Sequence, residues 1–260
     1  MKQHSFKVVI PARFGSSRLP GKPLLDIAGK PMVQHVFERA VETGINPDGN
    51  IVVATDDERI LNICHGFGAH AVMTASEHDS GTDRLAEVAE IMGWDDESII
   101  VNLQGDEPLM PHQLITKVAI NLAENKSAGI STLSTPIHDA DDLFDPNIVK
   151  VVTNQTGLAL YFSRAPIPWD RDNYKSASKA TMVSLPHPQR HLGMYAYRAK
   201  TLKTIAAASA ADIETLEALE QLRALWLGIG IHVESISEQP GHGVDTPADL
   251  ERVRAEFTHQ

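Results

Sequence analysis

Short apolar runs alternate with amphipathic segments through the first half of the chain. Five runs rich in β-branched residues predict buried strands, at 6–12, 51–55, 70–74, 98–103 and 130–135. Between them apolar residues recur at helical spacing, which predicts helices at 31–43, 57–66, 81–92 and 111–124. Strands that alternate with helices are typical of βαβ units, so we expect a mostly parallel sheet with helices on both faces.

The second half of the chain is less regular. A hairpin is expected from 148–153 and 157–163, with a turn from Asn154 to Gly157. The pattern then predicts a strand, one long helix, a strand and a final helix, at 191–198, 212–228, 231–236 and 247–257. The long helix has the clearest amphipathic pattern, with an apolar stripe of Ile213, Leu216, Leu219 and Leu222. No repeat or linker divides the chain, so we predict a single domain, 1–260, with a small inserted lobe and arm at about 138–198.

Three polar segments follow predicted strands, at 13–23, 56–57 and 104–108. In open parallel sheets, ligands bind beyond the carboxyl ends of the strands. We therefore expect these three segments to converge in space around a ligand.

The net charge of −11 argues against nucleic acid and anionic membranes as partners. The first 25 residues nevertheless contain five cationic side chains and no carboxylate, which suggests a local anion site. A single cysteine, Cys64, excludes an intrachain disulfide framework and a cysteine-rich zinc site. No apolar run reaches the roughly 20 residues of a membrane helix, and the N-terminus does not resemble a signal peptide. These features predict a cytoplasmic protein.

The loop 11-PARFGSSRLPGKPL-24 combines small residues with Arg13, Arg18 and Lys22, which suits a polyphosphate. A solvated basic loop is an equally good interpretation of this segment alone. Five residues separate Gly15 from Gly21 and a proline follows Lys22, so the spacing does not fit a P-loop. The absence of G-x-G-x-x-G argues against an NAD enzyme, and the absence of G-x-S-x-G against that class of acyl-transfer enzyme.

Two aspartates are candidate metal ligands. Asp106 lies in QGDEP (104–108), directly after a predicted buried strand, and Asp245 lies in GHGVDTPADL (241–250). Carboxylate oxygens are the ligands that Mg²⁺ prefers. Taken singly, however, a turn or helix-capping role is the more common one for such aspartates, and a lone histidine such as His191 is more often structural than catalytic.

Eight segments occur in order: IPARFGSSRLPGKPL (10–24), VATDD (53–57), SGTDR (80–84), NLQGDEP (102–108), YFSRAPIPW (161–169), HLGMYAYR (191–198), LEQLR (219–223) and VDTPADLE (244–251). Together they resemble the 3-deoxy-manno-octulosonate cytidylyltransferases, or CMP-Kdo synthetases, over about residues 7–254. Each motif alone is weak, but eight at compatible spacing are specific. The continuation RLPGKPL is typically missing from the related sialic acid cytidylyltransferases.

The resemblance implies a three-layer α/β/α, Rossmann-like nucleotidyltransferase fold with a dimerisation arm. It implies an enzyme that transfers CMP from CTP to 3-deoxy-D-manno-octulosonate (Kdo), releases pyrophosphate and activates Kdo for lipopolysaccharide biosynthesis. It also implies Mg²⁺ as the cofactor and a cytoplasmic homodimer. A cytidylyltransferase for another keto-acid sugar and a non-catalytic nucleotide-binding regulator are the alternatives.

The matching motifs also imply site residues. Lys22, Asp106 and Asp245 would be catalytic, and both aspartates would bind the metal. CTP would contact Arg13, Ser17, Lys22, Ser80 and Arg84. Kdo would contact Gln104, Arg164, His191, Tyr195, Glu220 and Gln221, with Arg164 as the expected partner of the sugar carboxylate. The segment 171–188 departs from the family pattern, which leaves contacts of the arm with the substrate open.

Overall fold

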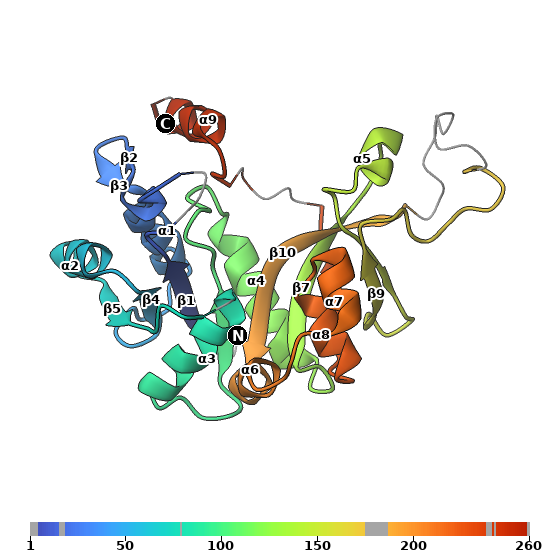
Figure 1. Cartoon of the computed structure of the whole chain (residues 1–260), viewed down its shortest axis with the longest axis horizontal. Helices are drawn as coiled ribbons and strands as arrows, with labels where there is room; N and C mark the ends of the chain where they lie inside the picture. The colour runs from blue at the N-terminus through green and yellow to red at the C-terminus, as the bar shows by residue number, and fades with distance from the viewer. Residues whose placement is uncertain are drawn as a thin grey trace.

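A central sheet with helices on both faces forms the body of the protein (Figure 1). The computed structural model describes residues 5–15, 19–78, 80–174, 187–237, 241 and 243–258. The strand order is β11-β7-β10-β6-β1-β4-β5, and the neighbouring pairs are parallel except those that involve β10. This arrangement confirms the predicted three-layer α/β fold with a mostly parallel sheet.

The strands of this sheet are β1 (Lys7–Ala12), β4 (Ile51–Thr55), β5 (His70–Met73), β6 (Ile99–Asn102), β7 (Ile130–Pro136), β10 (Gln189–Arg198) and β11 (Ile231–Ser235). The longer helices are α1 (Met32–Val41), α2 (Glu58–Gly66), α3 (Gly81–Ile91), α4 (His112–Glu124), α6 (Ala199–Ala206) and α9 (Pro247–Thr258). Every strand predicted from the apolar runs is present, and the four predicted helices of the first half are α1 to α4.

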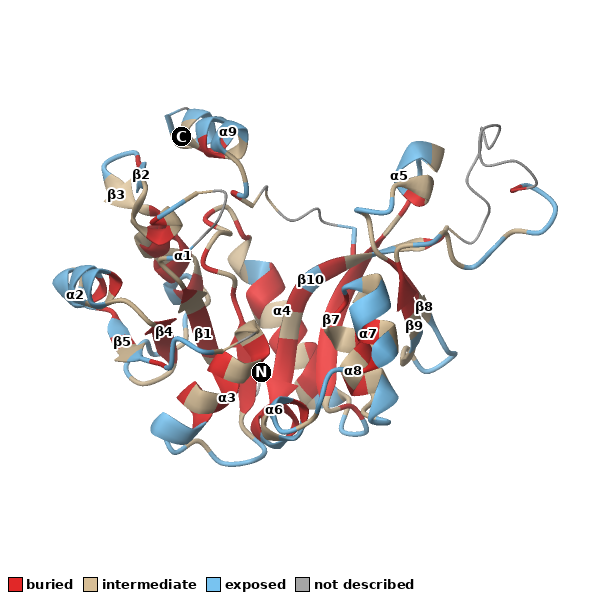
Figure 2. Ribbon diagram, in the orientation of Figure 1, coloured by how far each residue is buried: buried red, intermediate tan, exposed pale blue. Residues whose placement is uncertain are grey.

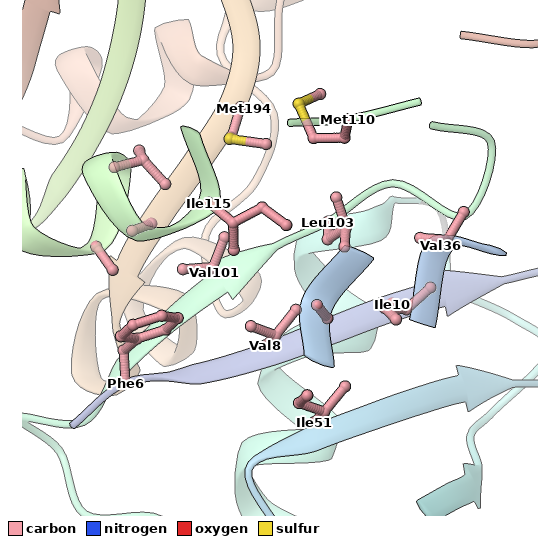
Figure 3. Packing of buried hydrophobic residues seen from close by; sticks show 14 of the residues in the cluster. Phe6, Val8, Ile10, Val36, Ile51, Val101, Leu103, Met110, Ile115 and Met194 are labelled. Carbon is pink, nitrogen blue, oxygen red and sulfur yellow. The ribbon is translucent and has the colours of Figure 1, made fainter. Parts of the chain in front are cut away.

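Alternate residues of the strands point to two separate cores. On one face, Val8 and Ile10 of β1 and Val101 of β6 pack against α1 and α4, as Figure 3 shows for Val36 and Ile115. On the other face, Val9 and Ile100 pack against α3, α6 and the segment 219–225. The strands are therefore buried on both sides, while the outer faces of the helices are exposed (Figure 2). This explains why the strand sequences are almost continuously apolar.

The predicted helix over 212–228 is wrong. The chain forms two short helices instead, α7 (Asp212–Glu217) and α8 (Gln221–Trp226). They are separated at Ala218, whose φ of 49° and ψ of 51° lie in the left-handed region. Leu216, which the helical stripe placed on the buried face, is 84% exposed. A left-handed residue changes the direction of the chain, so one helical period cannot describe both sides of it.

Three further elements were not predicted: the hairpin β2–β3 (Asp26–Ile27 and Lys30–Pro31), α5 (Ala140–Phe144) and α6. The first two are too short to produce a periodic pattern. The predicted hairpin of the inserted lobe is confirmed as β8 (Lys150–Thr153) and β9 (Ala159–Ser163). Strand β8 pairs with β10, which attaches the hairpin to the central sheet. Of the arm, residues 175–186 lie outside the described residues.

A buried cation holds three segments of this lobe together. Lys150 is fully buried, and its Nζ donates to the carbonyls of Asp145, Ile148 and Arg164 at 2.9, 2.5 and 2.6 Å. Burial lowers its pKa, which the nearby carboxylate of Asp145 partly offsets. Three carbonyl acceptors satisfy the three N–H donors of the ammonium, so the charge is tolerated without an ion pair at its tip.

The left-handed conformation of Ala218 generates a stability prediction. Ala218→Gly should raise the free energy of unfolding by about 0.5–1 kcal/mol, because glycine avoids the Cβ clash but gains freedom in the unfolded chain. Urea unfolding measures the change. The matched control is Ala224→Gly inside α8, which should lower the free energy of unfolding by about 1 kcal/mol or more. A loss of stability in Ala218→Gly similar to that of the control would contradict the prediction.

Candidate active site

The site lies where β1 and β6, adjacent strands of the sheet, reach their carboxyl ends. The connections from these two strands run in opposite directions along the sheet, so their ends leave a crevice. Arg13 and Lys22 from the first loop line one cavity here with Gln104 and Asp106. A Cβ at Gly105 would lie 2.5 Å from the carbonyl oxygen of Pro11, so only glycine allows the two loops to approach this closely.

Lys22 joins the two candidate metal ligands. Its Nζ lies 2.6 Å from Oδ2 of Asp106 and 3.3 Å from Oδ1 of Asp245. The ammonium side chain is only 12% exposed, whereas the carboxylate side chains are 32% and 58% exposed and can face a ligand. The expected convergence of residues far apart in the sequence is therefore confirmed for Lys22, Asp106 and Asp245.

A small apolar cluster explains how Asp245 reaches this place. Val244, Leu250 and Val253 pack against Ile27 and Met32, so α9 and the segment before it are fixed to the β2–β3 hairpin and the start of α1. The backbone N–H of Val244 also donates to the carbonyl of Asp106 at 2.9 Å. Burial of this cluster stabilises the contact between the two ends of the chain.

The carboxylate of Glu107 belongs to the same group of charges. Burial, followed by the charges of Asp106 and Asp245, raises the pKa of Glu107 to about 8, and Lys22 opposes this shift. One of its oxygens, Oε2, is enclosed and has no hydrogen-bond partner. A Cβ at Gly243 would lie 2.9 Å from Oε1, so the backbone of Gly243 lies directly against the Glu107 carboxylate.

A larger cavity of about 320 Å³ adjoins the first one and shares Gln104 with it. Its floor is apolar, with Met110, Leu114 and Met194 among the lining residues. Its polar side chains include Glu107, Asp142, Arg190 and His191. The volume and the mixture of apolar floor and polar wall fit a small polar ligand such as a monosaccharide.

His191 is held in the wall of this cavity. Its ring packs against those of Phe162 and Tyr195, with centroids 4.9 and 5.3 Å away, and its Nε2 lies 3.0 Å from the hydroxyl of Thr132. Burial lowers its pKa to about 3. The imidazole is therefore neutral at physiological pH and can bind a hydroxyl but contributes no charge.

The other predicted sugar residues lie around a smaller cavity. Tyr195, Glu220 and Gln221 line a space of about 100 Å³ with Tyr197. Burial raises the pKa of both tyrosines, with the carboxylate of Glu220 adding to the shift, so their hydroxyls stay protonated. Oε1 of Glu220 is buried without a hydrogen-bond partner. The predicted sugar residues thus line two cavities that share no lining residue, and the rings of His191 and Tyr195 lie in tilted contact between them.

Arg164 does not lie in any of these three cavities. Its Nε, Nη1 and Nη2 donate to the carbonyls of Glu217, Pro146 and Ala218 at 2.6, 2.9 and 3.4 Å, and its backbone N–H donates to the Glu217 carboxylate. The guanidinium therefore fixes the left-handed turn between α7 and α8. Its expected contact with the sugar carboxylate stays a prediction.

The predicted nucleotide residues have different surroundings. Ser80 caps α3 and forms a capping box with Asp83. Arg84 is fully buried, donates to Asp56 at 2.9 Å and contacts the hydroxyl of Thr74. The charge of Arg84 interacts with that of Arg13, so Asp56 lies near the first loop, as the sequence predicted. The guanidinium of Arg84 therefore holds Asp56 and Thr74 in place beside the first loop. Ser17 lies outside the described residues.

The two aspartates suit a magnesium ion. Mg²⁺ needs only one or two carboxylates when substrate phosphates and water complete its coordination. Asp106 and Asp245 supply such a pair, already close to a shared cation. Among the described residues, no group of three or more His, Cys, Asp or Glu side chains could form a metal site made by protein ligands alone. The residues therefore fit a metal that binds together with a phosphate ligand.

Comparison with known proteins addresses the family. A family model described as cytidylyltransferase matches residues 7–236. A relative from Hahella chejuensis named 3-deoxy-manno-octulosonate cytidylyltransferase is 54% identical over 251 residues, which cover 96% of this chain and 97% of that protein. The chain belongs to the 3-deoxy-manno-octulosonate cytidylyltransferase family. A family member from Pseudomonas syringae is 53% identical over 250 residues, or 96% of this chain and 97% of its own.

Solved structures agree with this family. A CMP:2-keto-3-deoxy-manno-octonic acid synthetase complexed with CTP has a TM-score of 0.86 at 42% identity, covering 98% of this chain and 99% of that one. A cytidylyltransferase from Leptospira borgpetersenii, 15% identical with a TM-score of 0.62, shares the fold over 98% of this chain and 87% of its own. Among helices in the described residues, none combines the length and apolar content needed to cross a membrane.

The motif comparison did not single out several polar side chains of the large cavity, among them Asn102, Glu107, Asp142 and Arg190. Asn102 is 5% exposed, lies opposite Tyr195 on the β6–β10 ladder, and has an Oδ1 without a hydrogen-bond partner. Asn102 could have been found from the sequence, because it is a polar residue at the end of an apolar strand run. The position of Arg190, directly before His191, was the signal for Arg190.

The environment of His191 predicts how stability depends on pH. Its pKa is about 3 in the folded protein and ordinary when unfolded, so below pH 6.5 only the unfolded state takes up the proton. The free energy of unfolding should therefore fall as the pH drops from 6.5 towards 3, by up to about 1.4 kcal/mol per pH unit from this group. Urea unfolding across this range should show a shallower fall in His191→Gln. The exposed His65→Gln is the control, and equal slopes in wild type and His191→Gln would contradict the assignment.

Proposed function

We propose that this protein transfers CMP from CTP to Kdo, giving CMP-Kdo and pyrophosphate. Its family membership and its match to a synthetase complexed with CTP support this activity. The observation in the structure that carries it is the bridge of Lys22 between Asp106 and Asp245, at a basic loop cavity that shares Gln104 with a monosaccharide-sized cavity. The product activates Kdo for lipopolysaccharide assembly.

The reaction brings two anions together. The anomeric hydroxyl of Kdo attacks the α-phosphorus of CTP in line, its proton is lost, and pyrophosphate leaves. Little covalent chemistry is required of the protein, so positioning and charge neutralisation supply most of the rate. Arg13 and Lys22 face the cavity that would receive the phosphates, and Gln104 lies where the two cavities meet. Gln104 is therefore placed to orient the attacking hydroxyl.

Mg²⁺ dependence is part of the proposal. Asp106 and Asp245 would hold the ion, which would neutralise phosphate charge and lower the pKa of a hydroxyl bound to it. Lys22 keeps the two carboxylates together when no ion is bound. When the nucleotide is bound beside Asp106 and Asp245, the ammonium of Lys22 would lie close enough to contact its phosphates.

On the sugar side, hydrogen-bonding groups of several kinds are available. His191, Tyr195, Glu220 and Gln221, which line the two cavities, would bind hydroxyls of Kdo. A site whose buried polar groups need those hydroxyls rejects analogues that lack them, because the groups would be left unpaired. The unpartnered Oε1 of Glu220 and Oδ1 of Asn102 are such groups.

A pyrophosphate-release assay with CTP, Mg²⁺ and Kdo tests the activity. We expect release only when all three are present, and CMP-Kdo as the product by mass spectrometry. Sialic acid and 8-amino-Kdo in place of Kdo test the sugar, and ATP, GTP and UTP test the nucleotide. Binding of CTP without pyrophosphate release from any of these sugars would refute the proposal.

The carboxylate pair generates a mutational prediction. Asp106→Asn and Asp245→Asn should each lower kcat by roughly 10²-fold or more, if each carboxylate contributes about 3 kcal/mol at the transition state. The exposed Asp48→Asn, which removes the same charge far from the cavities, is the matched control. Rates near wild type in both site variants, with stability unchanged, would rule out the metal-binding role.

We also propose a cytoplasmic homodimer. Leu216 and Trp226 on the outer side of α7 and α8 are 84% and 66% exposed, and Leu227 follows at 41%. Large exposed apolar side chains on adjacent helices favour a protein partner, and a second copy is the commonest one.

The double substitution Leu216→Ser with Trp226→Ser should raise the dimer dissociation constant about 10-fold or more, because apolar anchors supply most of the free energy of association. Sedimentation velocity over a concentration series measures this constant. Ile91→Ser, which removes an exposed apolar side chain from α3, is the control. A wild-type protein that stays monomeric at high concentration would contradict the dimer.

A further inference from the structure

The polar segment after β4, Asp56 and Asp57, reaches the site only indirectly. Neither aspartate is among the described residues that line the loop cavity. Asp56 accepts a hydrogen bond from Arg84, and Asp57 caps α2, where its carboxylate accepts the backbone N–H of Arg59 at 2.9 Å. A capped first turn is a well-fixed part of a helix. The start of α2 is therefore a firm support beside the first loop.

The side chain of Arg59 is oriented by the same aspartate. Its Nε and Nη2 donate to Oδ1 and Oδ2 of Asp57 at 2.9 and 2.6 Å, and two parallel hydrogen bonds fix the plane of the guanidinium. The guanidinium carbon lies 3.4 Å from the centroid of the Phe14 ring. At this distance the cation is attracted by the negative face of the ring. Arg59 thus connects α2 to the first loop.

Phe14 lies where the two ends of the first loop meet. The backbone N–H of Gly21 donates to the carbonyl of Phe14 at 3.0 Å. Cε2 of the ring lies 3.1 Å from the position that a Cβ would take at Gly21. Arg13 directly precedes Phe14, Lys22 directly follows Gly21, and both cations line the loop cavity. A contact that fixes Phe14 therefore fixes the backbone from which both cations extend.

We propose that Arg59 is a positioning residue for nucleotide binding. Its guanidinium, oriented by Asp57, holds Phe14 in place and so keeps Arg13 and Lys22 directed at the triphosphate. This inference rests on the proposed function and adds to it a residue that does not touch the substrate. A loop held in its binding conformation binds more tightly, because a larger fraction of the free protein is competent to bind. Arg59 should thus affect CTP and leave the sugar unaffected.

Isothermal titration calorimetry of CTP with Mg²⁺ measures the dissociation constant without sugar or turnover. Arg59→Ala should raise this constant about 3- to 10-fold, as expected for loss of a cation–π contact on a half-buried ring. Arg59→Lys should raise it less, because the charge stays while the double hydrogen bond to Asp57 is lost. In Phe14→Leu, where the ring is absent, adding Arg59→Ala should change the constant by less than about 2-fold.

The control is Arg39→Ala on α1, which removes the same charge and an ion pair with Glu42. It should leave the dissociation constant within about 2-fold of wild type. An equal rise for Arg59→Ala with and without the ring of Phe14 would overturn the inference, because Arg59 would then act through its charge alone. A rise as large in Arg39→Ala would overturn it for the same reason.

Steady-state kinetics separate this inference from the proposed function. In Arg59→Ala, KM for CTP should rise while KM for Kdo stays within about 2-fold. An equal rise in both would overturn the inference, because a general structural defect affects both substrates. Wild-type protein that binds CTP but releases no pyrophosphate with Kdo would refute the proposed function. The role of Arg59 in CTP binding would then still be decided by the calorimetric comparison with Phe14→Leu.

Discussion

The ion pairs of Lys22 determine whether the site exists. Asp106 and Asp245 repel each other, and Glu107 adds a third acidic group beside them. Without a cation between them, two like charges at this distance would favour separation or proton uptake. Lys22 is largely buried and reaches both carboxylates, so one ammonium keeps two acidic loops together. This arrangement lets the protein hold two carboxylates next to the basic loop cavity.

Backbone geometry makes that arrangement possible. Gly105 lets the QGDEP loop touch the end of β1, and Gly243 lets the last loop pass over Glu107. The apolar cluster under α9 supplies the free energy that holds this last loop in place. Mostly neutral groups then line the sugar side, where His191 and the two tyrosines stay uncharged because they are buried.

The apolar runs predicted the sheet well, because strands buried on both faces leave a continuous signal in the sequence. They could not predict the break at Ala218, since a single left-handed residue has no periodicity and Leu216 fits the helical stripe while facing solvent. Motifs identified Lys22, Asp106 and Asp245 as a set, and the structure brings them together. The motifs could not predict that Arg164 donates to the α7–α8 turn, because the carbonyls that accept its hydrogen bonds belong to the backbone and leave no residue-type signature.

The position of Asp245, close to the end of the residues described, has a consequence during synthesis on the ribosome. All strands of the central sheet precede residue 236, so the sheet can fold while the segment that contains Asp245 is still inside the exit tunnel. At that stage Lys22 and Asp106 are paired but the second carboxylate is missing. A nascent chain, or a fragment that stops before this segment, would therefore be folded in its main body but lack one carboxylate of the pair. The pair is completed only after α9 has emerged and packed against the β2–β3 hairpin.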